Sequence, residues 1–287
     1  MHPTHSLIST QVVAHCDNAL DWLWESLPAQ VSKVTVYTKC NQPISVKPVP
    51  AIATVTKLEN VGRCDHTFAH HMAHMGDDDP FNIVVFMKDS TYRGTYKKEY
   101  ENAIRSLDDT ALIALSQGFG CGERPATQHL DDVPLGNALS LYHSFDLWTR
   151  FQMNVYNRDL DAGNGRSAAG GGFVSQYCSL GEFYDALPLP VNWQPGKYVP
   201  SCYGGVFAVR KERIHSLGKA FWSRIEKILS RGDNIQEGHY MERSWAMLLS
   251  PKLSKADEKR LAATTKCAKN DDAYSLLRSG ILETVWA

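Results

Sequence analysis

The sequence predicts an α/β fold in which a mostly parallel central sheet is flanked by helices. Three segments, residues 9–14, 31–38 and 82–87, have the length and the Val/Ile content of strands. Two segments with apolar residues at helical spacing, residues 19–27 and 64–75, lie between them. This alternation is typical of a doubly wound parallel sheet and indicates a nucleotide-binding amino-terminal half.

The strand expected at residues 82–87 delivers polar side chains to one edge of that sheet. Its sequence, NIVVFM, suits a strand buried on both faces, and it ends abruptly in Lys88, Asp89 and Ser90. Ligands of open α/β sheets lie outside the carboxyl ends of the strands, so these three side chains are expected to face a ligand. An ordinary polar turn is the alternative.

Composition indicates a soluble globular protein. The chain has 287 residues, of which 43% are hydrophobic and 21% charged, enough for one large or two small domains. Its net charge of -1 gives no global attraction to nucleic acid or to an anionic membrane. The sequence has no run of eighteen apolar residues and no signal-peptide pattern, so we expect a cytoplasmic protein with no membrane insertion and no nucleic-acid partner.

The cysteines are expected to be free thiols. There are seven, they are widely spaced, and none belongs to a CxxC pair. An odd number argues against a complete disulfide framework.

The second half of the chain is expected to contain more loops. Residues 118–136 are rich in glycine and proline, whereas residues 97–107 and 139–156 have helical spacing. The glycine-rich residues 159–173 indicate either a mobile lid over a substrate or a surface linker.

Several aspartates are candidate metal ligands. A carboxylate at a strand end, such as Asp89, suits Mg²⁺ or Mn²⁺ bound to a nucleoside diphosphate, because these hard cations take oxygen ligands. Lys88 is the alternative, since an ammonium group neutralises a diphosphate directly. Residues 77–79 are three aspartates that precede a strand and are interpreted as a solvated turn, whereas Asp159 and Asp161 lie in the glycine-rich segment.

Four histidines in the helix expected at residues 64–75 form a second candidate metal site. His66, His70 and His74 advance by only about 40° per step around a helix, so three imidazoles can share a face, with His71 beside them. Zinc needs three or four convergent ligands. A mixture of packed and exposed histidines is the alternative.

The last amphipathic helix, expected at residues 234–249, carries two acids. Glu237 and Glu242 lie about 140° apart on a helix, so both cannot face one site from the helix body. Glu237, near the helix start, is the first candidate for a general base; a favourable interaction with the helix dipole is the alternative. Upstream, Gly204 and Gly205 permit close approach of a ligand, or form a β-bulge.

An ordered set of motifs resembles a little-characterised GT-A-like glycosyltransferase-related family. The set comprises VVAHCDNALDWLW, VTVYTK, NVGRCDHTFAHHM, NIVVFMKDS, YGGVFAVRKERI and EGHYMERSW. The resemblance covers about residues 10 to 250. It implies one catalytic domain over residues 1–250, with a nucleotide-sugar-binding half at 10–115, an acceptor-side half at 116–250 and a carboxyl-terminal extension at 251–287.

The resemblance implies transfer of a sugar from a nucleoside diphosphate sugar, most simply a UDP-sugar, to a hydroxyl of a glycan or glycoprotein. It assigns a catalytic base to Glu237 or Glu242, and a cation to Asp89 with His239 as a helper. The donor-binding positions that it implies are His15, Asp17, Tyr37, Thr38, Arg63, Lys88, Asp89 and Ser90. The acceptor side is implied for Tyr203, Gly204, Gly205 and Trp245.

The chain departs from the family pattern at two places. Cys16 and Asp17 replace an aromatic residue or Asn followed by Glu, and a single Asp89 replaces two acids. Two other functions are compatible with the sequence: a non-catalytic nucleotide- or sugar-binding module of the same fold, and a metal-dependent hydrolase built on the histidine helix.

Overall fold

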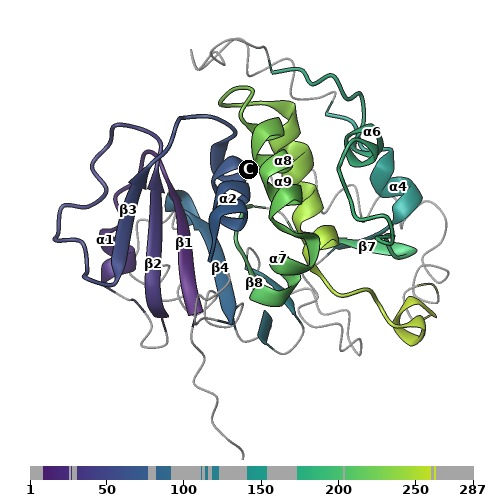
Figure 1. Cartoon of the computed structure of the whole chain (residues 1–287), viewed down its shortest axis with the longest axis horizontal. Coiled ribbons are helices and arrows are strands. Elements are labelled where there is room, and N and C mark those ends of the chain that lie inside the picture. Colours follow the sequence, from purple (N-terminus) through teal and green to yellow (C-terminus); the bar gives the residue numbers. More distant parts are fainter. Residues whose placement is uncertain are drawn as a thin grey trace, which may run out of the picture.

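A six-stranded mixed sheet organises the described part of the chain (Figure 1). The computed structural model describes residues 9–25, 27, 31–76, 82–91, 111, 114–115, 118–122, 141–153, 173–202, 204–259 and 262. The strand order is β3-β2-β1-β4-β8-β5. The first four strands in this order pair in parallel, whereas β8 is antiparallel to both β4 and β5. The strands are β1 (Ser9–His15), β2 (Val31–Thr38), β3 (Ala53–Lys57), β4 (Ile83–Lys88), β5 (Phe119–Cys121) and β8 (Phe207–Arg210).

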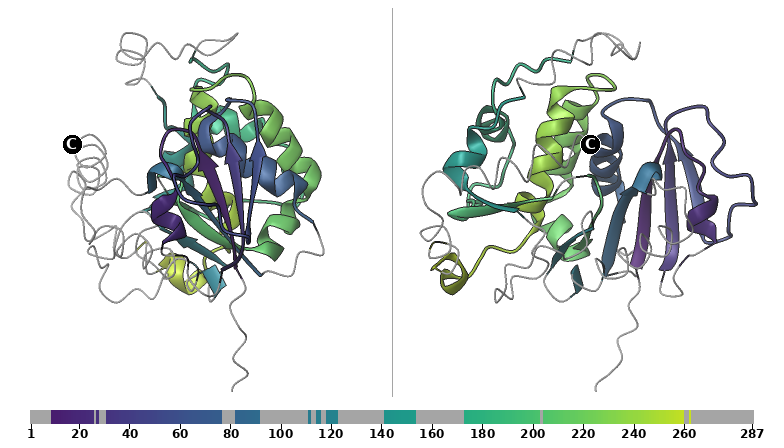
Figure 2. Two further views of the ribbon diagram at one scale, coloured as in Figure 1. Left: turned by 90° about the vertical axis from the view of Figure 1, so that its left-hand side faces the viewer. Right: turned by 180° about the vertical axis from the view of Figure 1, so that it is seen from behind.

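Helices cover both faces of the sheet. Figure 1 shows α2, α8 and α9 in front of it, and α1 lies on the opposite face, seen from behind in Figure 2. The strands alternate accordingly, because Val12, Val84 and Phe86 pack in the core under α2 and α9 while Val13 and Val85 pack with α1. The helices are α1 (Asp21–Trp24), α2 (Arg63–His74), α7 (Lys211–Leu217), α8 (Lys219–Leu229) and α9 (Gln236–Leu249).

A smaller unit packs beside the main sheet. The antiparallel pair β6 (Leu141–Ser144) and β7 (Tyr198–Ser201) lies with α4 (Phe145–Thr149) and α6 (Leu180–Asp185) on the side of α9 away from β1 (Figure 1). Trp148 joins it to α9, because its indole Nε1 donates to the carbonyl oxygen of Arg243 at 3.3 Å.

The predicted α/β class, with a mostly parallel central sheet and flanking helices, is confirmed. The strands expected at residues 9–14, 31–38 and 82–87 are β1, β2 and β4, and the helix expected at 64–75 is α2. Residues 77–79 and 97–107, as well as most of the glycine-rich segment with Asp159 and Asp161, fall outside the described residues.

Four details of the prediction were wrong. The helix expected at residues 19–27 is the short α1, and residues 139–156 contain a strand followed by a helix. The loop-rich segment after residue 118 contains β5. Strand β3 was not predicted; its outer edge position leaves four of its five residues exposed, so it shows no apolar alternation. After β8 the chain forms two helices, α7 and α8, which are divided at Gly218, whose φ is 81°.

The expectation of free thiols was also wrong for four cysteines. Disulfides join Cys16 to Cys40 and Cys121 to Cys202. Cys16 and Cys40 are 24 residues apart, but they follow adjacent parallel strands in which His15 pairs with Thr38. Disulfides persist mainly in oxidising compartments, which argues against the expected cytoplasmic location. In the described residues, none of the helices is both long and apolar enough to cross a membrane.

Candidate functional site

A polar cavity of about 590 Å³ lies at the carboxyl ends of the parallel strands. The ends of β1 and β4 form one wall, and the start of α2 and the first turns of α9 form the other. This is the edge at which open α/β sheets bind ligands. Eight residues predicted from the sequence line it: His15, Asp17, Arg63, Lys88, Asp89, Ser90, His239 and Glu242.

Asp89 organises the wall formed by the strands. It is only 6% exposed, and its Oδ2 accepts hydrogen bonds from three consecutive backbone N–H groups, those of Cys16, Asp17 and Asn18, at 2.8–2.9 Å. Three charge-assisted hydrogen bonds fix the loop after β1 against the end of β4. One carboxylate oxygen is therefore committed to the loop, and a cation would use the other one together with oxygens such as those of Asp17.

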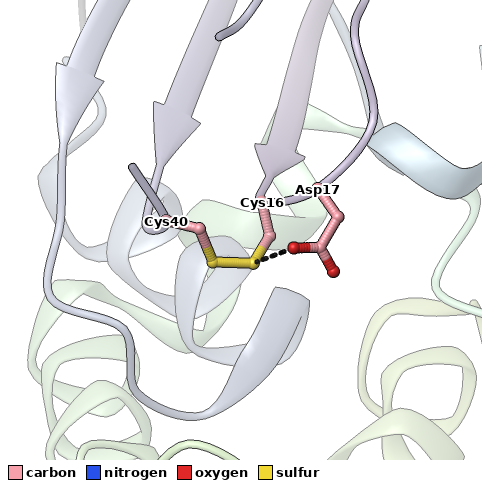
Figure 3. A group of neighbouring side chains, drawn as sticks. All are labelled: Cys16, Asp17 and Cys40. Carbon is pink, nitrogen blue, oxygen red and sulfur yellow. Dashed lines mark hydrogen bonds between the residues drawn. A yellow bond between two sulfur atoms is a disulfide. The ribbon is translucent and has the colours of Figure 1, made fainter. Parts of the chain in front are cut away.

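The Cys16–Cys40 disulfide fixes the same loop from its other side. Figure 3 shows the bridge at the tips of two neighbouring strands, with the carboxylate of Asp17 beside the Cys16 sulfur, 3.5 Å from Oδ1. Cys16 and Asp17 both line the cavity. The loop that carries Asp17 is thus held by a covalent bond and by the Asp89 carboxylate.

Lys39 lines the cavity but was not predicted. Its ammonium group donates hydrogen bonds to the carbonyl oxygens of Val61 and Arg63, and so joins the end of β2 to the start of α2. Burial lowers the pKa of Lys39 to about 8, against opposing contributions from Cys64, Asp233 and Asp65. Lys39 directly follows the strand predicted at residues 31–38. The argument that places Lys88 at the ligand-binding edge of the sheet therefore applies to Lys39 as well.

Asp65 and Glu242 are two acids on the wall formed by the helices. Both line the cavity, and Asp65 is 4% exposed. Burial, followed by repulsion from Glu242, raises the pKa of Asp65 to about 7. The indole Nε1 of Trp245 donates to Asp65 Oδ1 at 2.7 Å, and the backbone N–H of Gly204 donates to Glu242 Oε1 at 2.7 Å. A carboxylate with a pKa near neutrality in a cavity is suited to proton transfer.

Glu237, the first candidate for the base, lies outside the cavity lining. Arg231 Nη2 donates to its Oε2 at 2.7 Å, and the hydroxyl of Ser175 donates to its Oε1 at 2.9 Å. It is 3% exposed, so the carboxylate is buried as part of an ion pair. The order of the two candidates is corrected accordingly: Glu242, one and a half turns later on α9, faces the cavity.

His239 lines the cavity near two arginines. Burial, with the positive charges of Arg63 and Arg243, lowers its pKa to about 3. Its imidazole is therefore neutral at physiological pH, which is the form that binds metals. Cys64 also lines the cavity, but burial raises the pKa of its thiol, so it is not a reactive thiolate.

Three predicted ligand-contact residues, Tyr37, Thr38 and Trp245, have structural roles instead and lie outside the cavity lining. The Tyr37 hydroxyl is within 3.1 Å of His71 Nδ1 in the core, and the Thr38 hydroxyl is 3.1 Å from His15 Nδ1. Trp245 is fully buried and stacks on Phe207 with ring centroids 5.7 Å apart. Their predicted ligand contacts therefore have no support in this geometry.

The twin glycines are used for close packing. Gly204 and Gly205 have φ values of 86° and 70°, and a Cβ on Gly205 would lie 3.2 Å from the Cys64 sulfur. Gly204 still contributes to the site through its N–H, which orients Glu242. Tyr203 lies outside the described residues.

Comparisons with other proteins do not extend this picture. No protein-family model matches the sequence, and no curated protein is significantly similar to it.

Proposed function

We propose that the protein is a glycosyltransferase that moves a sugar from a nucleoside diphosphate sugar, most simply a UDP-sugar, to a hydroxyl of a glycan or glycoprotein. One observation carries the proposal. Six of the eight positions that the sequence resemblance assigns to the donor, together with Glu242, surround one cavity at the carboxyl ends of parallel strands.

The charges of the cavity suit a diphosphate. Lys88 from β4 and Arg63 from the start of α2 provide two cationic groups on opposite walls. A divalent cation, Mn²⁺ or Mg²⁺, is the second means of neutralising the diphosphate, and Asp17 and Asp89 are the carboxylates that would hold it, with His239 as a helper. When bound, such an ion stabilises the negative charge of the leaving diphosphate.

Glu242 is the proposed general base of an inverting transfer. The acceptor hydroxyl attacks the anomeric carbon and loses its proton to Glu242, while the bond from that carbon to the diphosphate oxygen breaks and the nucleoside diphosphate leaves with the electron pair. The N–H of Gly204 fixes Glu242 Oε1, and Oε2, which lies 3.9 Å from Arg243 Nη1, is the oxygen proposed to take the proton. Asp65 lies beside Glu242 in the cavity, and repulsion from Glu242 contributes to the raised pKa of Asp65.

A ligand screen followed by a matched pair of variants tests this function. UDP and GDP, each with and without Mn²⁺, are expected to raise the melting temperature, because ligands that bind only the folded state stabilise it. UDP-sugar hydrolysis or transfer is then measured for Glu242→Gln and Glu237→Gln. We expect Glu242→Gln to lose roughly 10²–10⁴-fold in turnover with donor binding retained.

Glu237→Gln is the control, because it removes the same charge from the same helix outside the cavity. We expect its folded fraction to turn over at a rate within about tenfold of the parent protein, well short of the loss for a general base. No stabilisation by any nucleoside diphosphate would overturn the proposal. Stabilisation without hydrolysis or transfer for any donor and acceptor would instead assign a non-catalytic binding module.

A further inference from the structure

Two of the four histidines on α2 meet an acid from a neighbouring helix, away from the cavity. His70 Nδ1 lies 2.7 Å from Glu226 Oε1, and His74 Nδ1 lies 3.8 Å from Glu226 Oε2. Helices α2 and α8, which carry them, run side by side in Figures 1 and 2. None of the three residues lines the cavity.

The other two histidines of α2 face different surroundings. His66 Nδ1 lies 3.3 Å from Lys39 Nζ, and His71 Nδ1 is hydrogen-bonded to the Tyr37 hydroxyl inside the core. The four histidines therefore do not form one cluster. Only His70 and His74, one turn apart with ring centroids 4.3 Å from each other, point to a common place.

The spacing of the three side chains suits a tetrahedral ion. One ligand atom from each of them lies within 4.8 Å of the other two. A tetrahedral zinc ion with bonds of about 2.0–2.1 Å separates its ligand atoms by about 3.3 Å, which lies between the two distances measured here.

Neighbouring groups contact both imidazoles. His74 Nδ1 donates to the backbone carbonyl oxygen of His70 at 2.9 Å, and an ion bound through Nδ1 replaces this hydrogen bond. Tyr37 and His70 pack in an edge-to-face arrangement, with ring centroids 5.3 Å apart. This packing restricts the orientation of the His70 ring.

We propose that His70, His74 and Glu226 form a binding site for a divalent transition-metal ion, with Zn²⁺ as the first candidate. Two imidazoles and one carboxylate are the ligand set, and water completes the coordination of the ion. The ion displaces the proton shared by His70 and Glu226. It links α2 to α8, and since none of its ligands lines the cavity, it is independent of the proposed glycosyl transfer.

Zinc uptake by the oxidised full-length protein tests the site. After equilibration with Zn²⁺ and dialysis without reductant, which preserves the Cys16–Cys40 bridge, we expect about one zinc per chain by elemental analysis and a raised melting temperature. His74→Ala and Glu226→Gln are each expected to weaken zinc binding at least tenfold. His74 is 57% exposed, so its removal leaves the fold intact.

Two controls separate this site from other ligands. His215→Ala removes a histidine from α7 and is expected to keep the parent affinity for zinc. Asp89→Asn changes the cavity and is also expected to keep the parent affinity for zinc. Absence of zinc uptake by the parent protein, or parent-like affinity in both His74→Ala and Glu226→Gln, would overturn the proposal.

Discussion

The two walls of the cavity hold their acids in opposite ways. On the strand wall, Asp89 is buried but accepts hydrogen bonds from three backbone N–H groups, so its carboxylate is held in one position. On the helical wall, Asp65 is buried beside another acid, and its pKa is raised to about 7. An acid of the first kind is suited to fixing the geometry of a site, and one of the second kind is suited to exchanging protons.

The largest expected effect comes from removing the acid of the strand wall. Asp89→Ala leaves three backbone N–H groups without their charged acceptor, so we expect the free energy of unfolding to fall by about 3–5 kcal/mol. Urea denaturation measures this change. Asp89→Asn, which keeps an acceptor oxygen, is expected to stay folded but to lose most of the stabilisation by UDP in a thermal-shift assay.

Asp21→Asn is the matched control for Asp89. Asp21 also accepts from consecutive backbone N–H groups, those of Val46 and Lys47, but it is the first residue of α1 and lies outside the cavity lining. Its variant is expected to keep the parent response to UDP. If Asp89→Asn keeps that response too, Asp89 has only a structural role and the strand wall does not bind the donor.

The second expected effect concerns the disulfide of the strand wall. Cys16→Ser/Cys40→Ser opens a loop of 24 residues, which by chain entropy corresponds to about 3 kcal/mol of stability. Because Cys16 carries one of the N–H groups bound to Asp89, UDP stabilisation is expected to weaken as well. Both effects are measured by thermal shift with and without UDP.

Removal of the second disulfide is the control that distinguishes a loss of stability from a loss of UDP binding. Cys121→Ser/Cys202→Ser opens a longer loop, with a sequence separation of 81, so its loss of stability is expected to be at least as large. Neither cysteine lines the cavity, and UDP stabilisation is expected to persist. Equal loss of UDP binding in both double variants would mean that the bridge near Asp17 has no specific role in the site.

The strand wall was more predictable from the sequence than the helical wall. Parallel strands end at one edge, so local patterns sufficed to bring together His15, Lys88 and Asp89. The same argument reaches Lys39, which was overlooked. The helical wall depends on how α9 packs against α2, and no local pattern shows that Glu242 meets Asp65 while Glu237 turns to Arg231. Cys16 and Cys40 likewise become neighbours only through strand pairing.

The smallest expected effect is a gain in stability, whereas most mutations lower the free energy of unfolding. The pKa of Asp65 is raised from 3.8 to about 7 in the folded protein, so its proton is held more tightly there than in the unfolded chain. Stability from this group is present at low pH and is lost as the pH rises from about 4 to about 7. At pH 8 the folded protein therefore contains an unfavourable buried charge.

Asp65→Asn removes that charge and keeps an oxygen for the indole N–H of Trp245. One pKa unit corresponds to about 1.4 kcal/mol, and the weaker acceptor offsets part of the gain, so we expect stabilisation of about 1–2 kcal/mol at pH 8. Urea denaturation at pH 8 and pH 5 should show a smaller gain at the lower pH, where the folded protein already holds the proton. An equal change at both pH values would show that Asp65 does not titrate in this range, and the contrast between the two walls would be lost.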